Sequence, residues 1–270
     1  MLRFPHGMRP STLDERRAFY ESEFDLADLS RWIGSRRGHL KFAMILGRHT
    51  GIFMPTRARN KDDVIIIDDW RNTRDIRSYA TSYLPEGLYY DRNRYVDTLA
   101  CAECAKDRTR CNDCRNISGQ QLAFDLDPEN VDCPYHGHIG QKMQSGRGLS
   151  FCMYEFRSVR RQAHDLCSEL RERYERVDIV YSGRGFHVVV DDEDGYALTT
   201  KQRRSLARAV GRRYDIDEWI TIGSSRLMRL PYSLNALVSR KCRIMKWGRD
   251  LFVFDPRTSR GVTPRFLRSP

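Results

Sequence analysis

Residues 177–190 read VDIVYSGRGFHVVV, and the fold is organised around this stretch. Apolar residues fill both ends, so strands are predicted at 177–181 and 187–190 with a tight Ser-Gly-Arg-Gly turn between them. Paired glycines let a backbone approach a ligand closely and expose its amide groups. The turn is therefore either a plain hairpin connection or a phosphate-binding loop, to which Ser182, Arg184 and His187 would add polar side chains.

A further strand is predicted upstream, where residues 121–127 read QLAFDLD and alternate in character. The two-residue period places Asp125 and Asp127 on one face at the strand end. Two carboxylates so close repel each other and are driven toward protonation unless a cation lies between them. Magnesium or manganese prefers such oxygen ligands. The alternative is a solvated strand end before Pro128.

Helical and strand patterns alternate along the rest of the chain. Thr12 and Glu15 predict a capping box before a helix, and Thr200 is expected to cap a basic helix. We also expect a long amphipathic helix over 156–174, a helix over 71–83, strands at 64–67 and 88–90, a strand pair within 39–53, and strand-like pieces within 219–238 and 251–254. This alternation predicts a mixed α/β fold, with one domain over 1–270 and a small insertion at 97–120.

Composition narrows the class of protein. The 270 residues are 40% hydrophobic, which is enough for a core that needs no disulfides. The 47 Lys and Arg residues exceed the 36 Asp and Glu residues, so the net charge is +11, which favours a polyanionic partner over an acidic substrate. No apolar run has the length of a signal peptide or of a membrane span. We expect a soluble protein of the cytoplasm or nucleoid, where cysteines indicate metal binding or burial.

Four cysteines lie within the polar stretch 97–120 at a spacing typical of zinc. They form two Cys-x2-Cys pairs separated by six residues, namely Cys101, Cys104, Cys111 and Cys114. Four thiolates close the coordination shell, so such a zinc ion would be structural. The alternative is a set of unliganded thiols.

A second candidate zinc site lies after the acidic strand. Its four members are Cys133, His136, His138 and Cys152, whose spacing is irregular. The sequence is compatible with either zinc site or with both. The number of zinc equivalents bound per chain would decide between these alternatives. Cys167 and Cys242 are expected to be packing residues.

A third motif follows near the C-terminus. Asp217, in DEWIT at 217–221, is a candidate third carboxylate, and Arg226 and Arg229 in RLMRLPYSL at 226–234 could reach a triphosphate. A charged surface strand followed by a proline turn would explain the same residues.

The order of the three motifs resembles a known family. FDLDP at 124–128, YSGRGFHV at 181–188, and IDEWIT with RLMRLPYSLN at 216–221 and 226–235 resemble the catalytic small subunit of archaeal and eukaryotic DNA primases. The upstream stretch VIIIDDW at 64–70 with DIRSYATSYLPEGLYYDRNRY at 75–95 is also similar. The chain is thus identified as a member of the archaeo-eukaryotic primase superfamily.

The resemblance implies a catalytic core with an RRM-like mixed sheet flanked by helices, plus a small zinc-binding element. It implies that two magnesium or manganese ions are held by Asp125, Asp127 and Asp217. It also implies that nucleotide is bound by Ser182, Arg184, His187, Arg229 and Arg48. Asn235 stands where relatives carry a histidine, and the family's zinc ligands usually follow the acidic motif, so the four-cysteine cluster departs from the pattern.

The activity implied is primer synthesis from nucleoside triphosphates on a single-stranded DNA template, by two-metal nucleotidyl transfer, together with a primase large subunit. A plasmid or viral primase-polymerase and an end-joining polymerase remain alternatives within the superfamily. A non-catalytic zinc-containing nucleic-acid-binding protein is an alternative of another class. Carboxylates that converge in a phosphate-binding cleft would argue against that last alternative, because their negative charge weakens phosphate binding.

Overall fold

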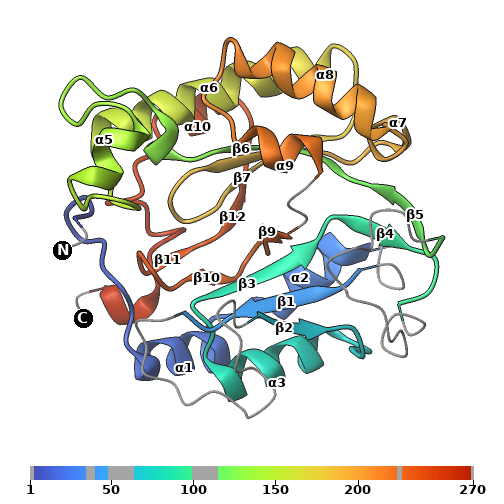
Figure 1. Cartoon of the computed structure of the whole chain (residues 1–270). Helices are drawn as coiled ribbons and strands as arrows, with labels where there is room; N and C mark the ends of the chain where they lie inside the picture. The colour runs from blue at the N-terminus through green and yellow to red at the C-terminus, as the bar shows by residue number, and fades with distance from the viewer. Residues whose placement is uncertain (1–2, 35–39, 48–63, 99–114, 224–226, 269–270) are drawn as a thin grey trace.

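The computed structural model describes residues 3–34, 40–47, 64–98, 115–223 and 227–268. Two four-stranded sheets stack on each other, and helices cover their outer faces (Figure 1). The mixed α/β class predicted from the sequence is confirmed. Every ladder in these described ranges is antiparallel.

The first sheet has the strand order β12-β7-β8-β6 and contains the hairpin predicted at 177–190. Its register places Asp125 opposite His187. The motif residues of two strands are therefore neighbours at one end of the sheet. The strands are β6 (Leu122–Leu126), β7 (Val177–Tyr181), β8 (Phe186–Val190) and β12 (Arg243–Met245).

The second sheet has the order β2-β1-β3-β9, and two short ribbons, β4-β5 and β10-β11, lie outside the main sheets. The sheet consists of β1 (Phe42–Ile45), β2 (Val64–Ile67), β3 (Gly87–Asp91) and β9 (Leu227–Arg229). The ribbons consist of β4 (Asn93–Tyr95), β5 (Ile117–Gln120), β10 (Leu234–Asn235) and β11 (Arg240–Lys241).

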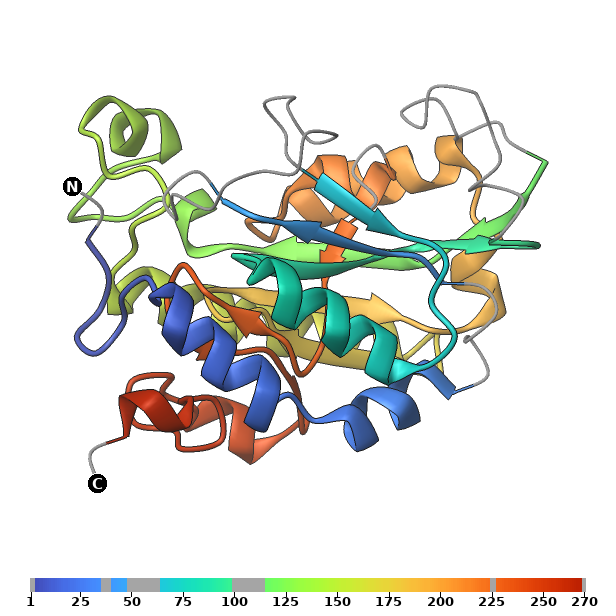
Figure 2. The ribbon, with the colours of Figure 1, turned by 90° about the horizontal axis from the view of Figure 1, so that it is seen from below.

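Helices α6 and α8 lie over the first sheet, and α1 and α3 lie over the second (Figures 1 and 2). No helix among the described residues is both long enough and apolar enough to cross a membrane. The longer helices are α1 (Leu13–Ser22), α2 (Leu26–Ile33), α3 (Thr73–Tyr83), α6 (Met153–Arg171) and α8 (Thr200–Gly211). The shorter ones are α5 (Ile139–Gln144), α7 (Glu193–Tyr196), α9 (Glu218–Ile222) and α10 (Arg249–Phe252), with 3-10 turns η3 (Pro128–Asn130) and η4 (Arg265–Leu267).

The alternation along β6 explains why its large apolar residues face α6 while the Asp125 carboxylate lies on the opposite face. Leu122, Phe124 and Leu126 are buried in the cluster beneath α6. Ala123 belongs to the other cluster, which fills the space between the sheets and extends to α1, α2 and α3. Asp125 shares the face of Ala123 because side chains alternate along a strand. Its carboxylate is thereby directed toward the second sheet.

Several local predictions are confirmed and others are wrong. The Thr12–Glu15 capping box is present, whereas Thr199, not Thr200, caps α8. Strand-like pieces are predicted within 219–238, and β9 and β10 confirm them there. Residues 219–222 are instead part of the helix α9, because Asp217 caps its start and the left-handed Gly223 ends it. Similarly, α10 replaces the strand expected at 251–254.

Strand β1 pairs with β2 and β3 instead of forming a strand pair within 39–53. Residues 48–63 of that prediction lie outside the described residues. The predicted insertion at 97–120 ends in regular structure, because residues 117–120 are strand β5 paired with β4. This strand was not predicted, because residues 117–120 are mostly polar and show no strand pattern. The four cysteines lie at 101–114, outside the described ranges.

Replacing Phe156 with alanine should cost about 3–5 kcal/mol of unfolding free energy, because the cavity left behind cannot collapse. Its buried ring lies within 6.3 Å, centroid to centroid, of the rings of Phe151, Tyr181, Phe186 and Phe254. The matched variant Phe252→Ala, at a ring that is 45% exposed, should cost about 1 kcal/mol or less. Urea unfolding measures both, and equal costs would contradict this description of the core.

Candidate active site and metal centre

A cavity of about 220 Å³ lies where the end of β6 and the turn after β7 meet the second sheet. Residues from β6 and β8 form one side, and residues from β3 and β9 form the other. The lining combines acidic, basic and polar side chains: Tyr89, Asp125, Asp127, Glu129, Leu149, Ser182, Arg184, His187, Leu227, Met228, Arg229 and Asn235. The acidic strand, the glycine turn and part of the third motif are therefore brought together.

Three carboxylates line this cavity. Asp125 is on β6, Asp127 follows it, and Glu129 lies one residue into η3. Burial, and then the charge of Asp127, raises the pKa of Asp125 well above its usual range. Burial, and then the charge of Glu129, raises the pKa of Asp127 to about 6. Asp125 and Asp127 thus favour protonation or a bound cation.

One atom in this group fits a divalent cation. Oδ1 of Asp125 is buried and makes no hydrogen bond to any described residue. It lies 3.5 Å from Nε2 of His187. Burial, followed by the positive charges of Arg229 and Arg92, lowers the pKa of His187 to about 3, so the ring is neutral near pH 7. An orphaned carboxylate oxygen among other carboxylates is a donor set that suits magnesium or manganese.

The glycine turn is packed tightly against the end of β6. Gly183 has a φ of +97°, which favours glycine. A Cβ on Gly185 would lie 2.3 Å from the carbonyl oxygen of Leu126, so only glycine allows this approach. The Ser182 hydroxyl accepts a hydrogen bond from the Gly185 amide at 3.1 Å. The turn therefore brings Arg184 against the acidic residues.

Arg184 is held by carboxylates. Its guanidinium contacts the Glu129 carboxylate, and its Nη2 lies 3.9 Å from Oδ2 of Asp127. Burial works to lower the pKa of Arg184, but the charges of Asp127 and Glu129 more than offset burial and raise it. Glu129 was not predicted from the sequence. Its only signal is the continued odd-numbered series of acids at 125, 127 and 129.

Arg229 brings a second guanidinium from β9. It lies over the Tyr89 ring, with the guanidinium carbon 4.7 Å from the ring centroid, and its Nη2 donates to the Tyr89 hydroxyl at 2.8 Å. Nη1 of Arg229 and Nε of Arg184 are both buried without a hydrogen-bond acceptor among the described residues. Donors of this kind are suited to anion oxygens such as those of a phosphate.

Asn235 fixes the turn from outside. Its buried side chain donates from Nδ2 to the Ser182 carbonyl oxygen at 3.0 Å. The Cys242 thiol reaches the same carbonyl at 3.2 Å, and Cys242 and Cys167 are both buried, which confirms their packing role.

Asp217 takes a different position from that of the other acids. Its side chain accepts a hydrogen bond from the Trp219 amide at 2.9 Å as the cap of α9. Its backbone amide donates to the Asp125 carbonyl oxygen, so it is a neighbour of β6. The cavity lining formed by the described residues does not include it. Arg48 and Arg226 lie outside those residues.

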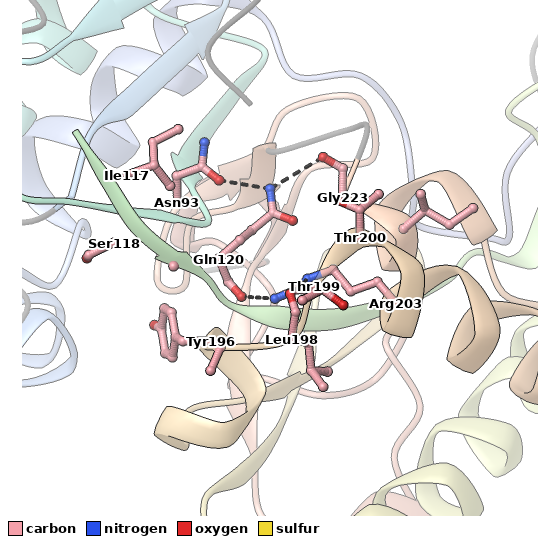
Figure 3. A pocket seen from close by; sticks show the side chains of 13 residues that line it. Asn93, Ile117, Ser118, Gln120, Tyr196, Leu198, Thr199, Thr200, Arg203 and Gly223 are labelled. Atoms are coloured by element: carbon pink, nitrogen blue, oxygen red, sulfur yellow. Dashed lines mark hydrogen bonds between the residues drawn. The ribbon is translucent and has the colours of Figure 1, made fainter. Parts of the chain in front are cut away.

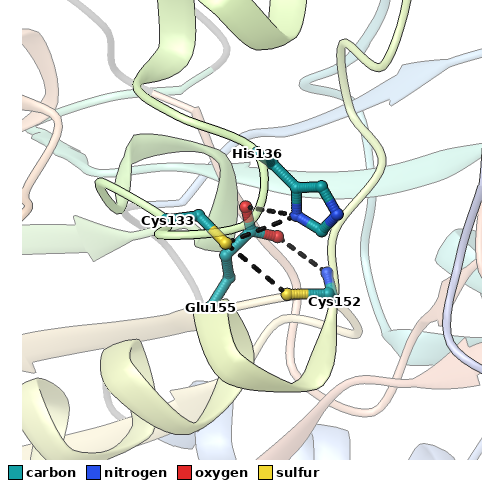
Figure 4. A group of neighbouring side chains, drawn as sticks. All are labelled: Cys133, His136, Cys152 and Glu155. Carbon is teal, nitrogen blue, oxygen red and sulfur yellow. Dashed lines mark hydrogen bonds and ion pairs between the residues drawn. The ribbon is translucent and has the colours of Figure 1, made fainter.

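A second cluster of ligand-type side chains lies between η3 and the start of α6 (Figure 4). Cys133, His136, Cys152 and Glu155 place one ligand atom each within 4.8 Å of all the others. Cys133 Sγ is 3.3 Å from Nδ1 of His136 and 3.9 Å from Cys152 Sγ. Two thiols, an imidazole and a carboxylate converging in this way fit a tetrahedral zinc ion.

Glu155 stands in this cluster in place of His138. The His138 ring instead accepts a hydrogen bond from the Gly140 amide as the cap of α5. The signal that was missed is the repeated spacing, because Cys133-x2-His136 is matched by Cys152-x2-Glu155 on the helix. Buried Lys142 forms an ion pair with Glu155 at 2.8 Å.

Another cavity, of about 300 Å³, lies at the opposite end of β6 (Figure 3). The Gln120 amide nitrogen donates to Oδ1 of Asn93 and to the Gly223 carbonyl oxygen, and the Arg203 guanidinium contacts the Gln120 carbonyl oxygen. Among the described residues that line it there is no carboxylate. The described lining therefore offers no charged oxygen ligand for a divalent cation.

Comparison with known proteins agrees with the motif resemblance. The chain is 49% identical over 268 residues to a protein of Archaeoglobus fulgidus described as an uncharacterized DNA primase small subunit-like protein, covering 99% of this chain and 94% of that relative. It is 25% identical over 200 residues to the DNA primase small subunit PriS of Thermococcus onnurineus, covering 73% of this chain and 49% of PriS. The chain thus spans about half the length of the PriS relatives.

Two further comparisons do not identify a family for this chain. No protein-family model matches the chain. A solved structure, the polymerase domain from Mycobacterium tuberculosis Ligase D in complex with DNA, aligns with a TM-score of 0.43 and 14% identity, covering 82% of this chain and 75% of that one. That TM-score does not establish a shared fold. The match to the Archaeoglobus protein over nearly both full lengths does establish the family, and the chain belongs to the DNA primase small subunit-like proteins.

Proposed function

We propose that this chain is a nucleotidyltransferase that synthesises primers from nucleoside triphosphates on a single-stranded DNA template. The observation that carries the proposal is one cavity that combines Asp125 and Asp127 with the guanidinium groups of Arg184 and Arg229. A protein that only bound nucleic acid would gain nothing from buried acid beside its phosphate-binding donors. The net charge of +11 suits a polyanionic template.

The carboxylates of Asp125 and Asp127 would hold magnesium or manganese, with Asp217 as a further acid close to β6. When bound, such ions lower the pKa of the primer hydroxyl and offset charge on the triphosphate. Arg184 and Arg229 would bind phosphate oxygens through their unpartnered N–H groups and stabilise negative charge as it develops. Neutral His187 and the amides of the glycine turn would orient the phosphates without adding charge.

The metal centre has a structural part in the proposal. Zinc held by Cys133, His136, Cys152 and Glu155 would tie the loop after η3 to the start of α6. The four-cysteine cluster at 101–114 stays a second zinc proposal. We also propose that the chain works with a primase large subunit, as the family resemblance implies.

Asp127→Asn should lower primer synthesis at least about a hundredfold, because a neutral amide binds a divalent cation far more weakly than a carboxylate does. The measurement is incorporation of labelled nucleotides on single-stranded DNA with magnesium or manganese. Folding should not suffer. The pKa of Asp127 is raised to about 6 in the folded protein, so the parent loses folding stability as the pH rises from about 4 to 6. At pH 7.5 the asparagine variant, which has no such charge to bury, should therefore be at least as stable as the parent.

Glu193→Gln, at an exposed acid paired with Arg94, provides a matched control that should keep full activity. Undiminished synthesis by a folded Asp127→Asn protein would contradict the proposed function. Absence of product from the parent protein with either metal would also overturn it.

Cys152→Ser should lower bound zinc by about one equivalent per chain, because a closed four-ligand site does not tolerate the loss of a thiolate. Elemental analysis of the purified protein measures it. His138→Ala is the matched control and should keep the parent zinc content, since that ring caps α5. Unchanged zinc in Cys152→Ser, or its loss in His138→Ala, would contradict the ligand assignment.

A further inference from the structure

Arg184 is a buried cation with two carboxylates in reach. Its side chain is 9% exposed, and those of Glu129 and Asp127 are 12% and 25% exposed. The guanidinium contacts Glu129, whereas its Nη2 stays 3.9 Å from Oδ2 of Asp127. A buried charge is costly without a partner, so Arg184 must pair with one acid or the other. In this structure the partner is Glu129.

The backbone of Glu129 is anchored by a buried lysine. Its carbonyl oxygen accepts a hydrogen bond from Nζ of Lys142 at 3.1 Å, and the same ammonium group donates to the Val131 carbonyl oxygen at 2.6 Å. Lys142 is itself buried and paired with Glu155 at 2.8 Å. These two hydrogen bonds hold the backbone of the 3-10 turn in place, and the Glu129 carboxylate contacts Arg184 from this fixed backbone.

We infer that Glu129 is a positioning residue that holds Arg184 away from Asp127 and so leaves the Asp127 carboxylate available to a divalent cation. The inference rests on the proposed function, because it assumes that Asp127 is a metal ligand. Without the Glu129 charge, Arg184 would turn to Asp127, the other acid that it already approaches. A guanidinium on that carboxylate would compete with the metal.

The experiment measures Mn²⁺ binding to the full, zinc-loaded chain without nucleotide, by calorimetry or by the loss of the free-ion electron paramagnetic resonance signal. Glu129→Gln should weaken Mn²⁺ binding about tenfold, as expected when the support of a metal ligand is lost. Arg184→Gln removes the competing cation and should not weaken binding. In the Arg184→Gln background, Glu129→Gln should then have no further effect, because its influence passes through Arg184.

A direct ligand role for Glu129 gives a different pattern. Glu129→Gln would then weaken Mn²⁺ binding equally with and without Arg184, and this result would overturn the inference. Unchanged binding in the single variant would do the same. The double variant leaves no unpaired buried cation, so its comparison with Arg184→Gln tests a direct ligand role for Glu129 even where Glu129→Gln alone folds poorly.

Two controls separate this inference from the proposed function. Glu193→Gln breaks an Arg–Glu pair on the surface and should leave Mn²⁺ affinity unchanged. Asp127→Asn should abolish tight Mn²⁺ binding in every background. If Asp127→Asn binds as the parent does, the proposed metal site is wrong. If Asp127→Asn loses binding and Glu129→Gln does not, only the inference about Glu129 is wrong.

Discussion

The concentration of three carboxylates in one buried cavity is the constraint on which the rest of the structure depends. Asp125, Asp127 and Glu129 repel one another in a medium of low polarity, and this repulsion opposes folding. Arg184 offsets part of that cost, and the close approach of the glycine turn to the end of β6 brings Arg184 beside these carboxylates. A Cβ on Gly185 would overlap the Leu126 carbonyl oxygen and push the turn away. The remaining negative charge is what the proposed divalent cation would offset.

The metal centre and the cavity are mechanically connected. Glu155, a candidate zinc ligand on α6, pairs with Lys142, and Lys142 donates to the backbone of η3, which carries Glu129. Glu155 and Lys142 are buried and Glu129 is half-buried, so a displacement of one is expected to displace the next. Zinc at this position would therefore stabilise the acidic end of β6 as well as its own loop. Proximity along the chain, from residue 127 to residue 155, makes this support possible.

Sequence reasoning identified the parts of the site that follow from local period. Alternation along β6 places Asp125 and Asp127 correctly, and the paired glycines predict the turn at Arg184. It missed Glu129, because that role depends on a contact with a residue 55 positions away. It also took Ile220 and its neighbours for a strand, because β-branched residues outweighed the cap supplied by Asp217. Contacts between distant elements have no local period and so leave no such signal.

The third motif shows why the two sheets must stay stacked. Its first half, with Asp217, packs behind β6, whereas Arg229 belongs to β9 in the other sheet. The buried Arg92 guanidinium joins the halves of the molecule by donating to the carbonyl oxygens of Gln121 at 2.7 Å and Ile220 at 2.5 Å. The acids are thus held opposite Arg229 by packing between sheets, and no single element carries the site. Loosening that packing would separate Arg229 from the carboxylates, whereas Arg184, on the turn between β7 and β8, would stay beside them.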